Sequence, residues 1–303
     1  MQPIQSDYVK QMAAAVGFDA CGIAKAEALP NFQTQLEAWL SQGYHASMSY
    51  MADHRDMRSD PSKLFPGAQC VVSVLCSYNP TQTLSEPAPI ARYAYGEDYH
   101  EKLKRKLYLL LSLLKQEYPN LEGRPFVDTA PISDKLWAAK AGLGWIGHNT
   151  LLIHPTLGSW CNIGELILSL PANHYDTPIE NRCGNCDKCM NACSNQAICS
   201  LNGITAIDAR RCAAYNTIEN RDPQLPKQLR LNGCLFGCDR CQVVCPFNQH
   251  ATAKTEIPQD RLDQLSRLGE ISQPEFNKLR KHSALSRINF DQLMRNKSQS
   301  TIR

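Results

Sequence analysis

Ten of the fourteen cysteines in this 303-residue chain lie between residues 183 and 245. The stretch CGNCDKCMNACS spaces four of them, residues 183, 186, 189 and 193, as C-x2-C-x2-C-x3-C. The short x2 spacings let successive thiolates bind one 4Fe-4S cubane, whereas the x3 spacing turns the fourth sulfur towards a second cubane. The chemistry that this pattern predicts is electron transfer.

A second run, CDRCQVVCP at 238–246, contains three more thiolates and the proline that usually follows the crossing ligand. One cluster is therefore assigned to Cys183, Cys186, Cys189 and Cys245. The other is assigned to Cys193, Cys238 and Cys241, and its fourth ligand is either Cys234, which spacing favours, or Cys212. Paired CxxC motifs also suit zinc, but the x2-x2-x3 run and its partner favour cubanes.

The other cysteines fit a reducing compartment. Cys21, Cys70, Cys76 and Cys161 fall in apolar strands and are expected in the core, and Cys199 is left undecided. No secretory leader is recognisable. A chain with this many cysteines and no such leader is expected to keep its thiols reduced and to be cytoplasmic. The longest apolar run, LYLLLSLL at 107–114, is too short to cross a bilayer, and no membrane partner is expected.

The elements that position these groups alternate between strands and helices. Strands are predicted at 18–26, 68–78 and 124–131 and in NTLLIH and NIGELILSL. Helices are predicted at 31–42, at 98–118, which has a leucine stripe, and after a capping Ser133. This pattern predicts an α+β sheet domain with working loops at 54–60, 93–100, 128–134 and 154–160.

The C-terminal 26 residues, 278–303, carry seven lysines and arginines against one aspartate. Such a segment favours a polyanion such as RNA, because basic side chains neutralise phosphates and release counterions. The alternative is an ordinary solvated helix face. The candidate contacts are Lys278, Arg280, Lys281, Arg287 and Arg295.

Several stretches of the chain are similar to the epoxyqueuosine reductase family, cobalamin-dependent iron–sulfur enzymes that complete queuosine in tRNA. They are YMADHRDMRSDPSKLFPGA, ARYAYGEDYH, VDTAPISDKLWAAKAGLGWIGHNTLLI, both cysteine runs and DARRCAAYNTIE. The resemblance implies a cobalamin-binding catalytic α/β-like domain at 1–178 and a ferredoxin-like domain with two 4Fe-4S clusters at 179–250. A basic helical tail at 251–303 would contact tRNA.

The resemblance also implies the reaction. Electrons from an external low-potential donor would pass through the clusters to cobalamin and reduce epoxyqueuosine to queuosine at the wobble position. By match to the family motif, Cys212 is the last cluster ligand and Asp134 is the acid that protonates the leaving oxygen. Asp128 is a competing acid, and Tyr99 and His100 are candidates near the substrate or caps of the long helix.

The cobalamin site is expected at loops that follow strands. Its candidate residues are Arg58, Asp134, His154, Gly158, Ser159, Tyr215, Gln242 and Val243. The chain is expected to act as a monomer on epoxyqueuosine-containing tRNA. The alternatives are a related reductive dehalogenase, an electron carrier without its own substrate, and an RNA-binding adaptor with structural clusters.

Overall fold

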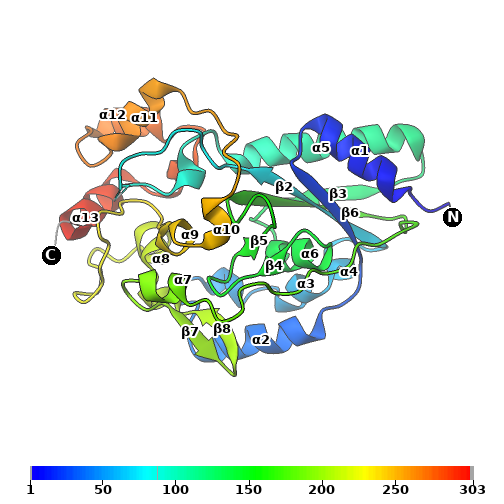
Figure 1. Ribbon diagram of the computed structural model, residues 1–303, viewed down its shortest axis with the longest axis horizontal. Coiled ribbons are helices and arrows are strands. Elements are labelled where there is room, and N and C mark those ends of the chain that lie inside the picture. Colours follow the sequence, from blue (N-terminus) through cyan, green and yellow to red (C-terminus); the bar gives the residue numbers. More distant parts are fainter. Residues whose placement is uncertain (1, 87, 301–303) are drawn as a thin grey trace.

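A four-stranded sheet organises the first part of the chain in the computed structural model, which describes residues 2–86 and 88–300. The strand order is β1 (Ala20–Lys25), β2 (Cys70–Ser77), β6 (Cys161–Leu168) and β3 (Gly123–Phe126), and every neighbouring pair is antiparallel. Helices separate the strands along the chain and lie on both faces of the sheet (Figure 1). The predicted α+β class is confirmed.

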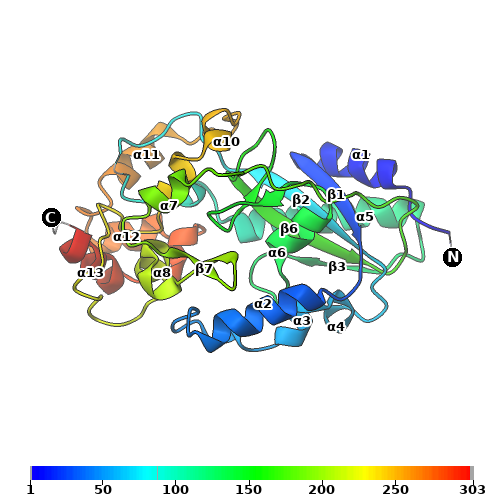
Figure 2. The same ribbon diagram turned by 60° about the horizontal axis from the view of Figure 1, so that its bottom comes forward.

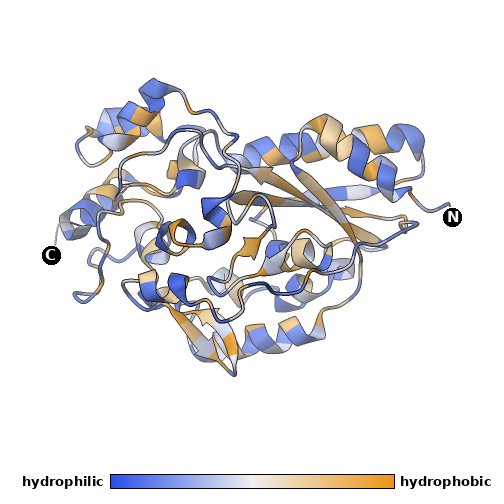
Figure 3. Cartoon of the chain, in the orientation of Figure 1, coloured by the Kyte–Doolittle hydropathy of each residue, from blue (hydrophilic) through white to orange (hydrophobic). Residues whose placement is uncertain are grey.

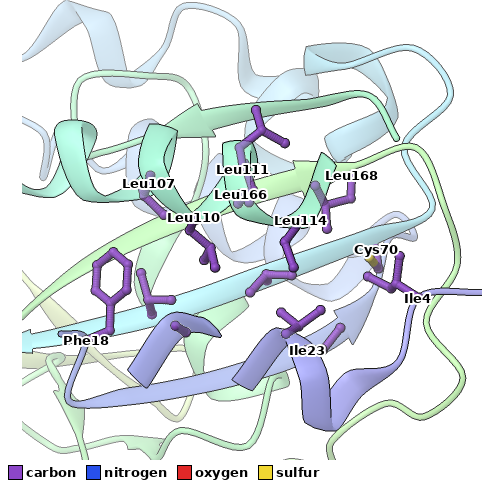
Figure 4. Close-up of a cluster of buried hydrophobic side chains, with 14 of the residues drawn as sticks. Ile4, Phe18, Ile23, Cys70, Leu107, Leu110, Leu111, Leu114, Leu166 and Leu168 are labelled. Carbon is purple, nitrogen blue, oxygen red and sulfur yellow. The ribbon is translucent and has the colours of Figure 1, made fainter. Parts of the chain in front are cut away.

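One face of the sheet is covered by α1 (Ser6–Val16) and α5 (Tyr99–Glu117). The predicted leucine stripe of α5 is fully buried against the alternate residues of β2 and β6 that point to the same side (Figure 4). Each such leucine contributes about 1.5–3 kcal/mol when removed from water. Asp98 begins α5 by accepting a hydrogen bond from the backbone N–H of His100 at 3.0 Å.

The opposite face is covered by α6 (Asp134–Lys140), and its largest buried side chain is Trp137. Three further helices lie below this face in the views of Figures 1 and 2. They are α2 (Pro30–Ser41), α3 (Arg55–Ser59) and α4 (Pro61–Leu64). Ser133 occupies the N-cap position of α6 as predicted, but its side chain makes no capping hydrogen bond.

Two predicted strands are shorter than expected. The strand predicted at 124–131 ends at Phe126, because Asp128 adopts a left-handed conformation with φ 50° that strand pairing does not allow. NTLLIH contributes only β5 (Leu152–Ile153), which pairs with β4 (Trp145–Ile146) in a small hairpin under α6. The loops that remain carry most of the candidate site residues.

The cysteine-rich segment consists of short elements joined by turns. Its hairpin is β7 (Ile198–Leu201) with β8 (Ile204–Ile207). Its helices are α7 (Lys188–Ala192), η3 (Ala209–Arg211), α8 (Ala213–Ile218), α9 (Arg240–Val243) and α10 (Pro246–Gln249). Segments this short cannot bury enough apolar surface to fold alone, which is consistent with covalent staples such as metal clusters.

The C-terminal helices form a second apolar core with Leu84, Ile90, Ala94 and Tyr95, which precede α5. They are α11 (Gln259–Ser266), α12 (Gln273–Leu279), η4 (Ala284–Arg287) and α13 (Phe290–Ser300). Two further short helices lie earlier in the chain, η1 (Ser49–Met51) and η2 (Arg92–Ala94). In Figure 3 the sheet strands are mostly hydrophobic and the C-terminal helices alternate hydrophilic with hydrophobic residues. Within the described residues, no helix has both the length and the apolar character to cross a membrane.

Candidate active site and iron–sulfur centre

Asp134 is the first residue of α6, and its Oδ1 atom is enclosed without a hydrogen-bond donor from the described residues. The side chain lies near that of Glu165 of β6, and each carboxyl shifts the pKa of the other. Burial raises the pKa of Asp134 to about 6, against smaller opposing effects of Glu165 and nearby backbone N–H groups. The site therefore holds a carboxylic acid that is easily protonated near neutral pH.

Glu165 is a site residue that the sequence reasoning missed. It is 0% exposed, and neither of its oxygens has a donor partner within residues 2–86 and 88–300. Burial, and then the nearby charge of Asp134, raise the pKa of Glu165 well above its usual range. The available signal was a single acidic residue inside the otherwise apolar strand NIGELILSL.

Tyr99 and His100 gather around Asp128 rather than capping the helix, because Asp98 is the cap. The Tyr99 hydroxyl donates to Asp128 Oδ2 at 2.7 Å. His100 lies between two carboxylates, with Nδ1 2.7 Å from Asp98 Oδ1 and Nε2 3.0 Å from Asp128 Oδ2. Both ring nitrogens can donate only when the ring is protonated.

The pKa shifts in this cluster follow from those contacts. Burial would lower the pKa of His100, but the hydrogen bonds to Asp128 and Asp98 raise it. Burial would raise the pKa of Asp128, but hydrogen bonds from His100 and Tyr99 lower it. Asp128 is thus held as a carboxylate, which makes it a poorer proton donor than Asp134.

Arg58 lies near both aspartates. Its Nη2 donates to the backbone oxygen of Tyr50 at 2.9 Å, and its charge interacts with Asp134, Asp128 and Asp53. Its Nε atom is enclosed and has no acceptor among the described residues. A buried unpaired donor is costly, so this atom is suited to an acceptor on a bound molecule.

The loop between β5 and β6 brings together three of the predicted cobalamin residues. His154 and Gly158 form a two-sided backbone bridge, with N···O distances of 2.9 and 3.0 Å. His154 Nδ1 accepts the backbone N–H groups of Thr156 and Leu157, each at 3.2 Å. Its pKa is lowered, chiefly by burial, so the ring is neutral at neutral pH.

Ser159 connects this loop to the cysteine-rich segment. Its hydroxyl donates to Gln242 Oε1 at 2.9 Å, and Gln242 Oε1 also accepts from the Tyr78 hydroxyl at 3.2 Å. Gln242 Nε2 donates in turn to Asp239 Oδ1 at 2.9 Å. Gln242 directly follows Cys241 in α9, and Val243 is the last residue of this helix. The structure therefore brings His154, Gly158, Ser159, Gln242 and Val243 into one region.

Tyr215 contacts Ser47, which lies three residues before the Tyr50 whose backbone oxygen accepts from Arg58. Its hydroxyl is 2.6 Å from Ser47 Oγ and accepts the backbone N–H of Ser47 at 3.1 Å. The neighbouring Tyr50 is electrostatically coupled to Arg58 and Asp128. No hydrogen bond joins Tyr215 directly to the Ser159–Gln242 contacts among the described residues.

Four cysteines line a cavity of about 50 Å³ between α7, β7, α8 and α9. They are Cys193, Cys212, Cys238 and Cys241, the set inferred for the second cluster. Cys234 lines a different pocket, where it meets Cys238 beside Arg92 and Asp239. Thiolates around a common cavity fit a cubane better than the alternative set that includes Cys234.

The first cysteine set also converges. Cys189 and Cys245 each interact electrostatically with Cys183 and Cys186, and Cys245 packs beside Cys183 in one apolar cluster. The other cysteines lie in the sheet and its surroundings: Cys70 and Cys76 are buried, and Cys21 and Cys161 are half-buried. Cys199 lies in β7, and its thiol donates to the Ala206 carbonyl at 3.6 Å.

The basic candidates at the C-terminus differ in their surroundings. Lys278 and Lys281 are exposed. Arg287 forms a two-pronged ion pair with Glu219 at 2.8 and 2.9 Å, and Arg280 donates to the Ser286 carbonyl at 2.7 Å. Arg295 donates to the carbonyls of Asn216, Asn220 and Asp222, so its guanidinium is occupied within the chain.

Comparisons with known proteins agree with this arrangement. Residues 58–129 match the family model described as epoxyqueuosine reductase QueG, DUF1730, and residues 182–248 match the 4Fe-4S double cluster binding domain. The chain is 43% identical over 297 residues to the epoxyqueuosine reductase of Leadbetterella byssophila, covering 96% of both proteins.

Two solved structures share the fold. A complex of epoxyqueuosine reductase with an epoxyqueuosine-modified tRNA-Tyr stem loop is 26% identical, with a TM-score of 0.83. The Bacillus subtilis enzyme, solved with its catalytic aspartate loop swung out of the active site, has the same identity and TM-score. Each match covers 97% of this chain and 80% of the solved chain.

The enclosed acid at the start of α6 and the two cysteine sets define an iron–sulfur oxidoreductase with a double-cluster segment. The extent of the match to the relative from Leadbetterella byssophila then decides the family. The chain belongs to the epoxyqueuosine reductase family.

Proposed function

We propose that this chain reduces epoxyqueuosine in tRNA to queuosine. The reaction removes the epoxide oxygen as water, consumes two electrons and two protons, and leaves a carbon–carbon double bond. The observation that carries the proposal is the enclosed Asp134 carboxyl, whose pKa is raised to about 6. Breaking a C–O bond needs a proton donor of this kind, because an unprotonated oxide is a poor leaving group.

Asp134 acts as that acid, and Asp128 supports it. A donor near neutral pH needs a raised pKa, which burial gives to Asp134, whereas the contacts with His100 and Tyr99 lower the pKa of Asp128. The macrodipole at the start of α6 favours the ionised form of Asp134, and burial outweighs it. The catalytic aspartate loop of the Bacillus subtilis enzyme is consistent with this role.

Tyr99 and His100 lie on the substrate side of Asp128 in this proposal. Their hydrogen bonds fix the carboxylate of Asp128, whose backbone is in the left-handed region that aspartate tolerates better than most residues. A protonated His100 also supplies positive charge beside two carboxylates. The pair therefore orders the loop that leads from β3 to Asp134.

The eight cysteines assigned above hold the two 4Fe-4S clusters. Cobalamin is held by Arg58, Asp134, His154, Gly158, Ser159, Tyr215, Gln242 and Val243. The enclosed Nε of Arg58 fits this group, since the amide oxygens around a corrin and the phosphate of its nucleotide tail accept hydrogen bonds. When bound, the clusters and cobalamin supply the two electrons that the epoxide requires.

The residues between the two cofactor sites fix the position of the cysteine-rich segment relative to the sheet domain. Ser159 of the sheet domain bonds to Gln242, which directly follows the cluster ligand Cys241. Tyr78 and Asp239 complete the hydrogen bonds of the Gln242 amide. Because a buried amide with both ends satisfied is rigid, the cluster segment is fixed against the cobalamin residues.

The exposed Lys278 and Lys281 are assigned as the main contacts with tRNA. Arg280 and Arg287 are assigned as additional contacts at the margin of the same surface. Arg295 is reassigned from RNA contact to stabilisation of α13, because its donors are already used by backbone carbonyls. The tRNA complex of a solved relative supports an RNA substrate. We also infer that the three segments 1–178, 179–250 and 251–303 divide catalysis, electron transfer and RNA contact.

We further infer a monomer that works in the cytoplasm with an external low-potential reductant. The decisive experiment loads the protein anaerobically with iron, sulfide and cobalamin and supplies a competent reductant with epoxyqueuosine-containing tRNA. Mass analysis of the released nucleoside is expected to show the loss of one oxygen atom. An unchanged nucleoside, with both cofactors loaded, contradicts the proposal.

A further inference from the structure

Glu165 is a carboxylic acid in the interior of the sheet, at a position where its neighbours along the strand are apolar. It is 0% exposed and lies in the middle of β6, between strands β2 and β3. Its two oxygens meet no hydrogen-bond donor from the described residues. An ionised carboxylate in such a position costs far more than a protonated one, because nothing replaces its hydration.

The strand register shows which way the side chain points. Glu165 pairs directly with Ser73 of β2 and Phe126 of β3. Directly paired residues project from the same face of a sheet, and Phe126 packs in the apolar cluster that contains Trp137 of α6. Glu165 therefore points into the layer between the sheet and α6, away from the leucines of α5.

Asp134 meets Glu165 in that layer. The two carboxyls lie close enough for each to shift the pKa of the other, and the Oδ1 atom of Asp134 is enclosed without a hydrogen-bond partner among the described residues. Two acceptors form a hydrogen bond only if a proton lies between them. The titratable and charged groups that face this pair from the elements around it are Asp128, Lys135, Arg58 and Tyr99.

We propose that Glu165 stays protonated at neutral pH and is the positioning residue for Asp134, donating its O–H to Asp134 Oδ1. This inference rests on the proposed acid role of Asp134. With Oδ1 used as an acceptor, the proton that Asp134 gives to the substrate is carried by Oδ2. Glu165 thus selects both the rotamer of the acid and the oxygen that holds its labile proton.

Burial is consistent with this assignment, because it raises the pKa of Glu165 well above the range in which a glutamate ordinarily ionises. No proton leaves Glu165 during turnover, so the reaction still consumes two protons. Glu165 contacts Asp134 and no substrate, which makes it a positioning residue and not a catalytic one.

Infrared spectroscopy of the cofactor-loaded protein tests the protonation state without substrate. At neutral pH, the wild type minus Glu165→Gln difference spectrum is expected to contain the carbonyl stretch of a protonated carboxylic acid. The matched control is Glu37→Gln, the same substitution at an exposed glutamate of α2, which is expected to remove only a carboxylate band. Absence of the acid band at Glu165 overturns the proposal, whether or not the protein reduces epoxyqueuosine.

The pH dependence of turnover tests the positioning role. Glu165→Leu removes a donor to the Asp134 carboxylate, so the pKa of Asp134 rises and the alkaline limb of the activity profile moves to higher pH. The value of kcat falls by about 10- to 100-fold, as expected for the loss of a hydrogen bond to an ionisable group. Glu165→Gln keeps a neutral donor and is expected to leave the limb unchanged.

An ionised Glu165 would give a different pH profile from a protonated one. If Glu165 were ionised, Glu165→Gln would remove a negative charge beside Asp134 and move the limb to lower pH. Ser73→Ala, directly opposite on β2, is the control for packing and is expected to leave the limb in place. Failure of wild-type turnover itself would reject the proposed function, while the infrared result would still decide the state of Glu165.

Discussion

Asn248 and Ser159 join the cysteine-rich segment to the sheet domain through two reciprocal hydrogen bonds. Asn248 Oδ1 accepts the backbone N–H of Ser159 at 2.6 Å, and Asn248 Nδ2 donates to Ser159 Oγ at 2.9 Å. Both residues are buried. The contact lies one residue from Gly158, in the loop assigned to cobalamin, so the geometry of that loop depends on α10.

Gly158→Ala is expected to destabilise the protein because it breaks this contact. A Cβ atom at Gly158 would lie 2.0 Å from Asn248 Oδ1, and the backbone there has φ +62°. We expect a loss of about 3 kcal/mol in the free energy of unfolding, measured by urea denaturation. The control is Gly203→Ala, which has φ +78° but open space around its Cβ; it is expected to lose about 1 kcal/mol. Equal losses would contradict the steric explanation.

Cys212→Ser is expected to remove the second cluster, whereas Cys234→Ser is expected to leave it in place. Cys212 shares a cavity with Cys193, Cys238 and Cys241, and Cys234 lies outside it. Two cubanes of four irons require eight irons per chain, so Cys212→Ser should retain about four after anaerobic reconstitution. The measurement is iron content with electron paramagnetic resonance of the reduced protein. Iron loss in Cys234→Ser alone would reverse the assignment.

The pH dependence of turnover should have an alkaline limb set by Asp134. The acid works when protonated, and its pKa is raised to about 6, so activity falls as pH rises through that value. Asp134→Asn is expected to lower kcat by about 100- to 10,000-fold with tRNA binding preserved. Asp128→Asn is expected to have a smaller effect, because its carboxylate does not supply the proton. Full activity of Asp134→Asn would remove the assignment.

The raised pKa of Asp134 also predicts that the free energy of unfolding depends on pH. A carboxyl whose folded pKa is raised above its unfolded value of 3.8 loses stabilisation as pH rises through about 6. Asp134→Asn lacks this loss, so its unfolding midpoint should exceed that of the wild type at alkaline pH. The difference is expected to shrink as the solution becomes mildly acidic, and thermal denaturation across pH measures it.

Substitutions of Arg295 and Lys281 should separate effects on fold stability from effects on RNA binding. Arg295 donates to three backbone carbonyls between α8 and the loop that follows it, so Arg295→Ala is expected to cost about 2–4 kcal/mol of unfolding free energy. Lys281 is exposed, so Lys281→Ala should leave stability unchanged and weaken binding of a tRNA stem loop about two- to fivefold. The two measurements are urea denaturation and equilibrium binding, and identical behaviour of both variants would be inconsistent with this division.

The sequence was sufficient for features that depend on neighbours along the chain. The cysteine spacings indicated a double cluster because ligand spacing limits which thiolates reach one cubane. The leucine stripe predicted α5 within one residue at each end, because apolar periodicity reports the buried face of a helix. The motif around Asp134 also placed the start of α6 correctly.

Only the tertiary structure could decide features that depend on residues far apart in the chain. Cys212 and Cys234 are both compatible with the spacing, and only the folding of η3 and α8 beside α9 brings Cys212 to the cavity. In the sequence, Glu165 is simply one acidic residue in an apolar strand. The strand register shows that it lies beneath α6, near Asp134. Arg295 reads as a surface cation until α13 packs on α8. Local sequence sets the periodicity and the ligand spacing, but burial and partner choice are set by long-range packing.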